Sequence, residues 1–334
     1  MKITFLAEGD AANVLTEYSH CINKHSDNIQ STVICSFAHP FNYKIKHDIN
    51  LHDCNSDQLD RVKQIIIESD IIIFAEEGLL YNRYKTIDVF NRAININLLE
   101  LGKKVIIWHP GTNYRENYHT YNNHPLRNKI YKHLYAIDLY RLSPKKDNDT
   151  PLLPYQYFNF NYSNYIKMFK QKLSNLPWTI LHIPSNASIK GTSMLQTAIN
   201  KLDLDPKQYK YKVLQNISHS EVIIEKQKSL FYLDQINETC GGYGLASLEA
   251  LLLSNLTFST INNSSDSLYK LTGKYETPVI PLTNNERELK ETLTQFIKNI
   301  SKEEMLDYIQ GIGKWIEDAY SPKNIVKQFK ELIA

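Results

Sequence analysis

The chain of 334 residues lacks the features by which metal, redox and membrane proteins are usually recognised. Its four cysteines are scattered and form no C-x-x-C pair, which argues against a zinc or dithiol site and favours reduced thiols. No apolar run approaches the roughly 18 residues that a membrane-spanning helix needs. Met1-Lys2 leads directly into a strand-like segment without a signal peptide. We therefore expect a cytoplasmic protein.

The chain also lacks a strong excess of either charge. Lysine and arginine number 38 against 36 aspartates and glutamates, a formal net charge of +2. This balance does not suggest bulk nucleic-acid binding, and we expect no nucleic-acid partner. Basic residues do gather at 44–47 and 127–132. We interpret them as solvated surface, with peripheral contact at the inner membrane face as the alternative.

Several catalytic motifs are missing as well. The turn at Gly9-Asp10 has no G-x-G-x-x-G, and Lys190-Gly191-Thr192 does not end a G-x-x-x-x-G-K-[ST] loop. H-E-x-x-H and G-x-S-x-G do not occur. Two D-x-D triplets, at 147–149 and 203–205, lie in polar loops, where too few oxygens converge for a hard cation. We expect no metal and no cofactor.

What the chain does contain is a regular alternation of strand-like and helix-like segments. Continuous apolar runs such as 71–75 and 104–108 are typical of parallel strands buried on both faces. The alternation restarts at Trp178 after a polar stretch. Because 334 residues exceed the usual size of one hydrophobic core, we predict an α/β protein with two Rossmann-like domains facing across a cleft. The predicted domains are residues 1–160 and 161–320.

The stretch 229–254 combines a strand, a glycine-rich turn and a helix start. An apolar run ends on Asp234-Gln235, and Gly241-Gly242-Tyr243-Gly244 precedes a helix that contains one acid, Glu249. Such a turn presents free backbone N–H groups to an anion, and an acid one or two turns later can reach polyol hydroxyls beside a bound phosphate. Simple tight packing of the turn is the alternative.

Three other side chains are candidates for a site. Lys190 stands at a helix start, where the dipole disfavours a cation unless an anion binds nearby; a solvated lysine is the alternative. His109 follows a buried strand and is interpreted as a hydrogen-bonding group aimed into the cleft, or else as a satisfied loop histidine. Arg115 either binds an anion or pairs with Glu116.

In combination these segments resemble the retaining glycosyltransferases of the GT-B fold, the family 4-like group typified by bacterial polysaccharide enzymes. Residues 182–192 resemble the H-x-P-S-N-x-x-x-K-G-T segment of the donor domain, and residues 234–250 resemble its D-Q…G-x-Y-G-x-x-x-x-E-A segment. Residues 9–13 and 109–115 resemble two loops of the acceptor domain. The last helix, residues 321–334, is expected to cross back to the first domain as it does in this fold.

The resemblance implies metal-independent transfer of a hexosyl or N-acetylhexosaminyl group from a nucleoside diphosphate sugar to a glycan or lipid-linked acceptor, with retention, as in polysaccharide biosynthesis. It assigns the donor diphosphate to Lys190, the ribose hydroxyls to Glu249 and a contact near the reacting carbon to His109. The backbone amides of the glycine-rich turn would support the phosphates at Gly242, Tyr243 and Gly244. Further residues expected in the cleft are Gly9, Asp10, Asn13, Ser185, Asn186, Asp234 and Gln235.

Two departures from the family pattern keep alternatives open. Ala187 stands where many relatives have an arginine, and Gly241 stands where many have a second, earlier glutamate. Arg115 is the candidate to supply the missing positive charge. The alternatives are a nucleotide-sugar epimerase on the same fold and a catalytically inactive, glycosyltransferase-like binding subunit.

Overall fold

The computed structural model of the chain divides into two compact units. The first comprises Met1–Tyr157 and Pro322–Ala334, and the second comprises Phe158–Ser321. The structure describes residues 1–37, 43, 45–75, 98–136, 139, 142–144, 149–152, 155, 159–237, 243–261 and 277–334. Among the helices within these ranges, none combines the length and apolarity that a membrane span requires.

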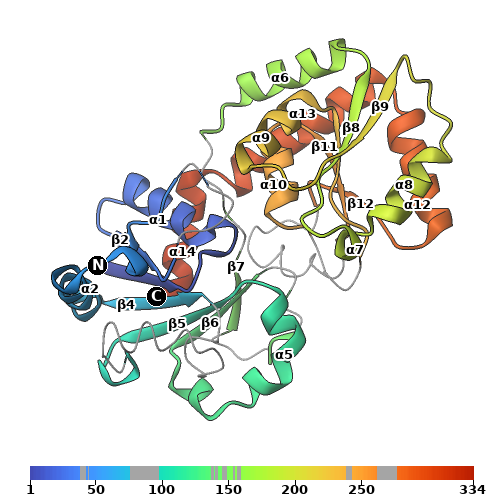
Figure 1. Ribbon diagram of the computed structural model, residues 1–334. Helices are drawn as coiled ribbons and strands as arrows, with labels where there is room; N and C mark the ends of the chain where they lie inside the picture. Colours follow the sequence, from blue (N-terminus) through green and yellow to red (C-terminus); the bar gives the residue numbers. More distant parts are fainter. Residues whose placement is uncertain are drawn as a thin grey trace. The chain divides into compact units, whose positions relative to one another are not determined.

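The first unit is built on a parallel sheet with strand order β3-β2-β1-β4-β5-β6-β7 (Figure 1). Because β2 and β4 lie on opposite sides of β1, the strand order reverses between β1 and β4, and ligands of open α/β sheets bind at the carboxyl ends of strands at such a reversal. Its strands and helices are β1 (Lys2–Ala7), α1 (Val14–His25), β2 (Gln30–Cys35), β3 (Ile49–Asn50), α2 (Ser56–Glu68), β4 (Ile71–Ala75), β5 (Lys104–His109), α5 (Thr112–Asn122), β6 (Lys132–Ala136), β7 (Asp149–Leu152) and α14 (Pro322–Ile333).

The C-terminal helix α14 belongs to the core of the first unit. Phe329 packs against Tyr18 of α1 and Phe5 of β1, with ring centroids 5.6 and 6.0 Å away. Figure 1 shows α14 beside α1. Burial of several large aromatic side chains, at about 25 cal/mol per Å² of apolar surface, is sufficient to hold this last segment on the sheet.

The second unit is built on a parallel sheet with strand order β12-β11-β10-β8-β9 (Figure 1). The chain runs outward from β8 to β9 and then returns to the other side of β8, so the order reverses between β8 and β10. Its strands and helices are α6 (Tyr162–Ser174), β8 (Trp178–His182), α7 (Ala187–Lys190), α8 (Thr192–Asn200), β9 (Tyr209–Val213), α9 (His219–Lys228), β10 (Phe231–Leu233), α10 (Leu245–Leu252), β11 (Leu256–Ser259), β12 (Ile280–Pro281), α12 (Glu286–Leu293) and α13 (Lys302–Ala319).

Three helices begin at reciprocal capping boxes. The pairs are Asn55 with Gln58 at α2, Ser218 with Glu221 at α9, and Ser301 with Glu304 at α13. In each pair one side chain accepts from the third backbone amide of the helix and the other accepts from the cap residue's amide. These contacts explain why the helices begin where they do, and two of them have the S-x-x-E signature in the sequence.

The observed elements differ in places from those that the sequence pattern favours. The pattern favours a strand from Tyr135 to Leu142, whereas β6 begins earlier, at Lys132, and ends at Ala136. A helix that the pattern favours at 86–101 falls mostly outside the described residues. β3, β7 and α5 were not predicted. β7 has the sequence DTPL, which contains a proline, but it forms the edge of the sheet, where a missing N–H is tolerated.

Candidate functional site

In the second unit, the carboxyl ends of β8 and β10 are joined through one imidazole. His182 is the last residue of β8; its Nδ1 lies 2.8 Å from the Leu233 carbonyl of β10, and its Nε2 lies 2.8 Å from the Thr192 hydroxyl. A carbonyl can only accept, so Nδ1 carries the proton and Nε2 accepts from Thr192. Burial lowers the pKa of His182, which agrees with a neutral ring. His182 therefore holds Thr192, the first residue of α8, next to the strand reversal between β8 and β10.

Next to this imidazole, a group that we call the Asp234 junction comprises Lys190, Asp234, Gln235 and Ser247. The Lys190 ammonium donates to Asp234 Oδ1 and to Gln235 Oε1, both at 2.9 Å. The Ser247 hydroxyl, in the first turn of α10, donates to Asp234 Oδ2 at 2.6 Å. Burial alone would raise the pKa of Asp234, but Lys190 and Ser247 outweigh it and hold that pKa below its usual value. One buried carboxylate thus links the lysine to the start of α10.

The glycine after Lys190 is required by geometry. Gly191 has a φ of +72°, in the left-handed region, and a Cβ at this position would lie 2.3 Å from Cγ1 of Ile236. The Ile236 amide donates to the Lys190 carbonyl at 3.3 Å. The K-G-T sequence therefore lets the loop after β8 approach the loop after β10 closely enough for Lys190 to reach Asp234.

The helix α10 begins at Gly244, which has no side chain to cap it. The first-turn amides of such a helix point outward and carry the positive end of the helix dipole. Tyr243 is buried and anchors the turn in the core. Gly241 and Gly242 lie outside the described residues, so the predicted phosphate contact of Gly242 stays a prediction.

A third group, the His219–Glu249–Lys226 cluster, joins α9 to α10. Glu249 Oε1 lies 2.7 Å from His219 Nε2, and its Oε2 accepts from the Lys226 ammonium at 2.7 Å. Burial would raise the pKa of Glu249, but Lys226 and the His219 hydrogen bond outweigh it and keep the pKa below its usual value. His219 and Lys226 were not recognised in the sequence. Their spacing of seven residues, which places both on one face of α9, was the available signal.

The other predicted donor-domain residues support the local backbone. Asn186 caps α7 by accepting from the Ile189 amide at 3.1 Å, and Ser185 beside it is exposed. Ala187 is the first residue of α7. The structure thus brings together Lys190, Asp234 and Gln235 and leaves Ser185 and Asn186 at the rim of the same loop.

In the first unit, the predicted residues after β1 are engaged with their own surroundings. The buried Asp10 carboxylate accepts from the Leu15 and Thr16 amides at 2.9 and 2.7 Å and so caps the start of α1. Asn13 adopts a φ of 61° and donates to the Ile45 carbonyl at 3.0 Å. A Cβ on Gly9 would lie 2.7 Å from Cε2 of Phe37, so this glycine admits the Phe37 ring. Their place in a ligand cleft stays a prediction.

His109, the last residue of β5, is fully buried. Its ring stacks on Tyr135 with centroids 4.4 Å apart, and its Nε2 lies 3.0 Å from Nδ1 of His133. Burial, with His133 and Arg127 nearby, holds the pKa of His109 well below its ordinary value. The ring is therefore neutral and packed at the carboxyl end of an interior strand, and its predicted contact with a donor sugar stays a prediction. Arg115 lies half-buried on α5, and its role also stays a prediction.

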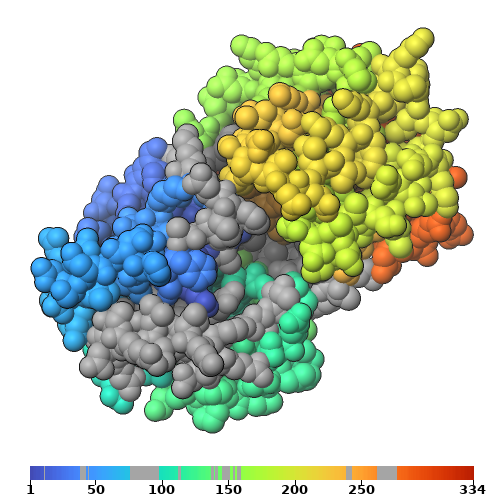
Figure 2. All heavy atoms as spheres, viewed as in Figure 1, coloured from blue at the N-terminus to red at the C-terminus, as the bar shows by residue number. Residues whose placement is uncertain are grey.

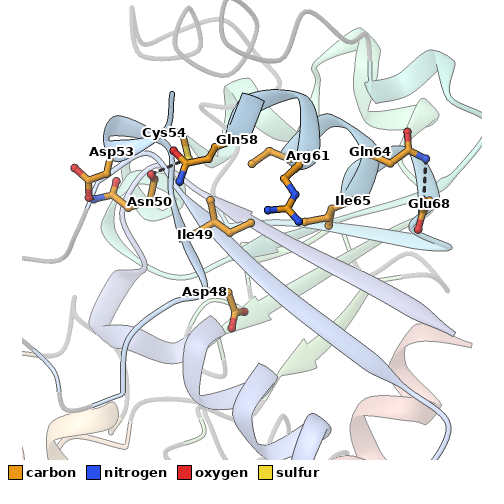
Figure 3. A pocket seen from close by; sticks show the side chains of 11 residues that line it. Asp48, Ile49, Asn50, Asp53, Cys54, Gln58, Arg61, Gln64, Ile65 and Glu68 are labelled. Carbon is orange, nitrogen blue, oxygen red and sulfur yellow. Dashed lines mark hydrogen bonds between the residues drawn. The ribbon is translucent and has the colours of Figure 1, made fainter. Parts of the chain in front are cut away.

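A separate cavity of about 650 Å³ lies between β3 and α2 at the edge of the first sheet (Figure 3). Its lining mixes Ile49, Ile65 and Arg61 with polar groups that pair among themselves, as Gln64 does with Glu68 at 2.8 Å. It contains none of the predicted site residues. Elsewhere in the described ranges, no three His, Cys, Asp or Glu side chains gather closely enough to hold a metal ion.

No sequence model of a protein family matches the chain, and a search among curated proteins finds no match. Solved structures do resemble it. One is an alpha-glucosyltransferase in complex with UDP and a 13-mer DNA with a central A:G mismatch, with TM-score 0.64, 11% identity and 100% of both chains covered. Another is an alpha-glucosyltransferase with UDP and a 13-mer DNA containing an HMU base, with TM-score 0.63, 12% identity and coverage of 100% and 99%. A structure of S. aureus MnaA with UDP gives TM-score 0.50, 12% identity and coverage of 98% and 94%.

These likenesses correct one expectation and confirm another. The expectation of no nucleic-acid partner is wrong. Proteins that share this fold over their whole length are found in complex with DNA, so such a partner is not excluded. Net charge averages over the entire surface, whereas a nucleic-acid site needs only a local match of charge and shape. The predicted architecture is confirmed: two parallel α/β sheets in two units give the chain the GT-B fold.

Proposed function

We propose that the protein is a glycosyltransferase that moves a hexosyl or N-acetylhexosaminyl group from a nucleoside diphosphate sugar to an acceptor hydroxyl, with retention at the anomeric carbon. The observation that carries the proposal is the Asp234 junction, which holds the Lys190 ammonium beside the first turn of α10 at the strand reversal of the second sheet. Likeness to UDP-bound structures of the same fold supports a nucleotide donor.

The donor diphosphate is assigned to Lys190 and the first-turn amides of α10. A charge-assisted hydrogen bond from an ammonium and the positive end of a helix both favour a phosphate anion. Glu249, five residues into α10, is assigned to the ribose hydroxyls, since side chains on a helix lean toward its N-terminus. Asp234 holds the Lys190 ammonium in place before the donor arrives, so little side-chain entropy remains to be lost on binding.

In the proposed reaction, the acceptor oxygen bonds to the anomeric carbon as the bond from that carbon to the diphosphate oxygen breaks. The acceptor proton passes to the leaving diphosphate oxygen. Lys190 and the α10 amides stabilise the negative charge that grows on the leaving group, and this electrostatic stabilisation is the main catalytic contribution. These groups supply the positive charge, so the proposal requires no metal ion.

For the acceptor, the proposal names a glycan or lipid-linked hydroxyl. A second candidate is the hydroxymethyl group of a modified DNA base. Full-length likeness to an alpha-glucosyltransferase in complex with DNA containing an HMU base supports this second candidate. Both acceptors present a primary or secondary hydroxyl and fit the same donor chemistry.

Donor binding is the first test. Calorimetric titration and thermal shift with UDP, GDP, ADP and their glucose or N-acetylglucosamine conjugates should identify one tightly bound nucleotide. Incubation of that donor should release free sugar slowly. If no nucleotide binds and none shifts the melting temperature, the proposed function is overturned.

The placement of the diphosphate is tested on Lys190. Lys190→Gln alone leaves Asp234 as an uncompensated buried charge, so the informative variant is Lys190→Gln/Asp234→Asn, which removes both charges. We expect its affinity for the nucleoside diphosphate to fall about 10- to 100-fold while its circular dichroism stays like that of the wild type. Lys207→Gln, an exposed lysine of the same unit, should bind normally. Unchanged affinity in the double variant would refute this placement.

Acceptor assays then separate the candidate functions. Labelled donor is incubated with lipid-linked glycans, with free oligosaccharides, and with duplex DNA that contains or lacks hydroxymethylated bases. Label on only the hydroxymethylated DNA would select the second acceptor. A change in the donor sugar without any acceptor would indicate an epimerase, and nucleotide binding without any turnover would indicate an inactive subunit.

A further inference from the structure

Helix α9 buries a lysine where an amphipathic helix would bury an apolar residue. Within α9, all of whose residues are described, Lys226 is the buried one, and its side chain is 0% exposed. The remaining residues of the helix are exposed or half-buried, and its gold spheres are visible at the surface of the second unit in Figure 2. A fully buried ammonium is expensive to desolvate unless it is paired and hydrogen-bonded. Lys226 is therefore expected to serve a specific partner.

That partner is Glu249, and three contacts hold the Lys226 ammonium in place. Its ammonium donates to Glu249 Oε2 at 2.7 Å and to the Ala246 carbonyl at 2.8 Å, and it lies 4.6 Å from the centroid of the Tyr232 ring. Ala246 and Glu249 are both on α10, so the lysine joins α9 to the first half of α10. Lys226 neutralises the carboxylate from the core side.

The other carboxylate oxygen is held from the opposite side. His219, the first residue of α9, lies with Nε2 2.7 Å from Glu249 Oε1. The side chains are 17% exposed for His219 and 9% for Glu249, so solvent reaches the carboxylate past the imidazole and not past Lys226. Each carboxylate oxygen has two lone-pair sites, so within the part of the chain that the structure describes one acceptor site on each remains after these two contacts.

We propose that His219 is a positioning and specificity-determining residue for the nucleoside ribose: it fixes Glu249 so that the free lone pairs of the carboxylate accept the vicinal 2′- and 3′-hydroxyls. This inference rests on the proposed function, since it takes Glu249 as the ribose contact. A carboxylate held at both oxygens cannot rotate, so it loses no side-chain entropy on meeting the diol. A nucleotide without these hydroxyls leaves the buried acceptors unpaired, which is the costly case.

The experiment measures discrimination between ribose and dideoxyribose. The nucleoside diphosphate among UDP, GDP and ADP that binds the wild type most tightly is titrated against its 2′,3′-dideoxy counterpart. We expect His219→Ala to reduce the ratio of the two affinities about tenfold, because Glu249 is then held at one oxygen only. His219→Gln, whose amide can donate to Oε1, should recover most of the wild-type ratio.

The outcomes are distinguishable. If the wild type binds no nucleoside diphosphate, the proposed function fails and this inference fails with it. If the wild type binds and discriminates, but His219→Ala keeps the full ratio, only the inference is overturned, even if the variant melts at a lower temperature. Gln227→Ala, an exposed neighbour on α9, should leave both the ratio and the melting temperature unchanged.

Discussion

Each unit places a buried aspartate in the loop after a strand at the reversal of its sheet, and the two aspartates are held in different ways. Asp10 follows β1, is buried, and receives two backbone amides from the first turn of α1. Asp234 follows β10, is equally buried, and receives the Lys190 ammonium and the Ser247 hydroxyl. Burial dominates for Asp10 and raises its pKa, whereas for Asp234 burial is outweighed by the lysine and the pKa is lowered.

The difference indicates where ligand chemistry is concentrated. Asp10 satisfies a helix end, which any α/β unit must do. Asp234 holds a cation in place at a strand reversal, a contact that the fold itself does not require. The same contrast applies to Glu249, which is ion-paired to Lys226 in the second unit, and to His109, which is stacked as a neutral ring in the first. The variants below test this contrast, from the largest expected effect to the smallest.

The largest effect is expected from Lys226→Met. It removes the cation from a buried ion pair and leaves Glu249 with His219 as its remaining partner in the cluster, which costs up to about 3–5 kcal/mol. Urea unfolding followed by hydrogen exchange should show this loss in the second unit. Lys226→Met/Glu249→Gln, which removes both charges, should recover most of it. Lys228→Met, an exposed lysine two residues away, should stay within about 0.5 kcal/mol of the wild type.

Loss of stability in the Lys228 control as large as that in Lys226→Met would mean that the helix, and not the ion pair, is responsible. A double variant no more stable than the single one would show that packing of the lysine stem matters more than its charge. Either result would show that the contrast between the two units does not depend on the charge of Lys226.

An intermediate effect is expected from His109→Gln. Burial, together with His133 and Arg127, lowers the pKa of folded His109 from the ordinary 6.5. The neutral ring therefore stabilises the first unit fully above about pH 6.5, and this stability is lost as the pH falls below that value, by up to about 1.4 kcal/mol per pH unit. His109→Gln should be about 1–3 kcal/mol less stable at pH 8 but should show a shallower dependence on pH.

Unfolding curves of the first unit between pH 8 and about pH 5 measure both quantities, with the exposed His119→Gln as the matched control. A variant as stable as the wild type that has lost sugar transfer would instead support the predicted contact of His109 with the donor sugar. In that case both units would contribute side chains to the ligand, although the electrostatics of their buried groups differ.

Part of the second unit's candidate site was named from the sequence: Lys190 because it stands at a helix start, and Asp234 and Gln235 because they resemble the D-Q segment of a known family. The structure brings these three side chains into contact, where Gly191 has a positive φ and passes close to Ile236, and their role toward a donor stays a prediction. The contacts of Glu249 were not foreseen, because a lysine in a polar helix such as α9 is normally solvated. α5 was missed because its many Asn, Tyr and His residues have low helix propensity, and burial of Tyr114 and Tyr121 compensates. Such compensation depends on tertiary packing, which a single sequence does not display.

The smallest effect is expected at Asp10, and it separates the cap from the charge. Asp10→Ala removes both acceptors for two amides of α1 and should destabilise the first unit by about 1 kcal/mol, whereas Asp10→Asn keeps one acceptor oxygen and should lose less at pH 7. Because folded Asp10 has a pKa raised above 3.8, its favourable contribution is complete below that pH and is lost as the pH rises through the folded pKa. Stability of the wild type relative to Asp10→Asn should therefore increase as the pH is lowered, and the exposed Asp27→Asn is the matched control. Nucleotide affinity should be the same in all of these variants at pH 7. A drop in affinity for Asp10→Asn without loss of stability would place this carboxylate at the ligand and make the two aspartates functionally equivalent.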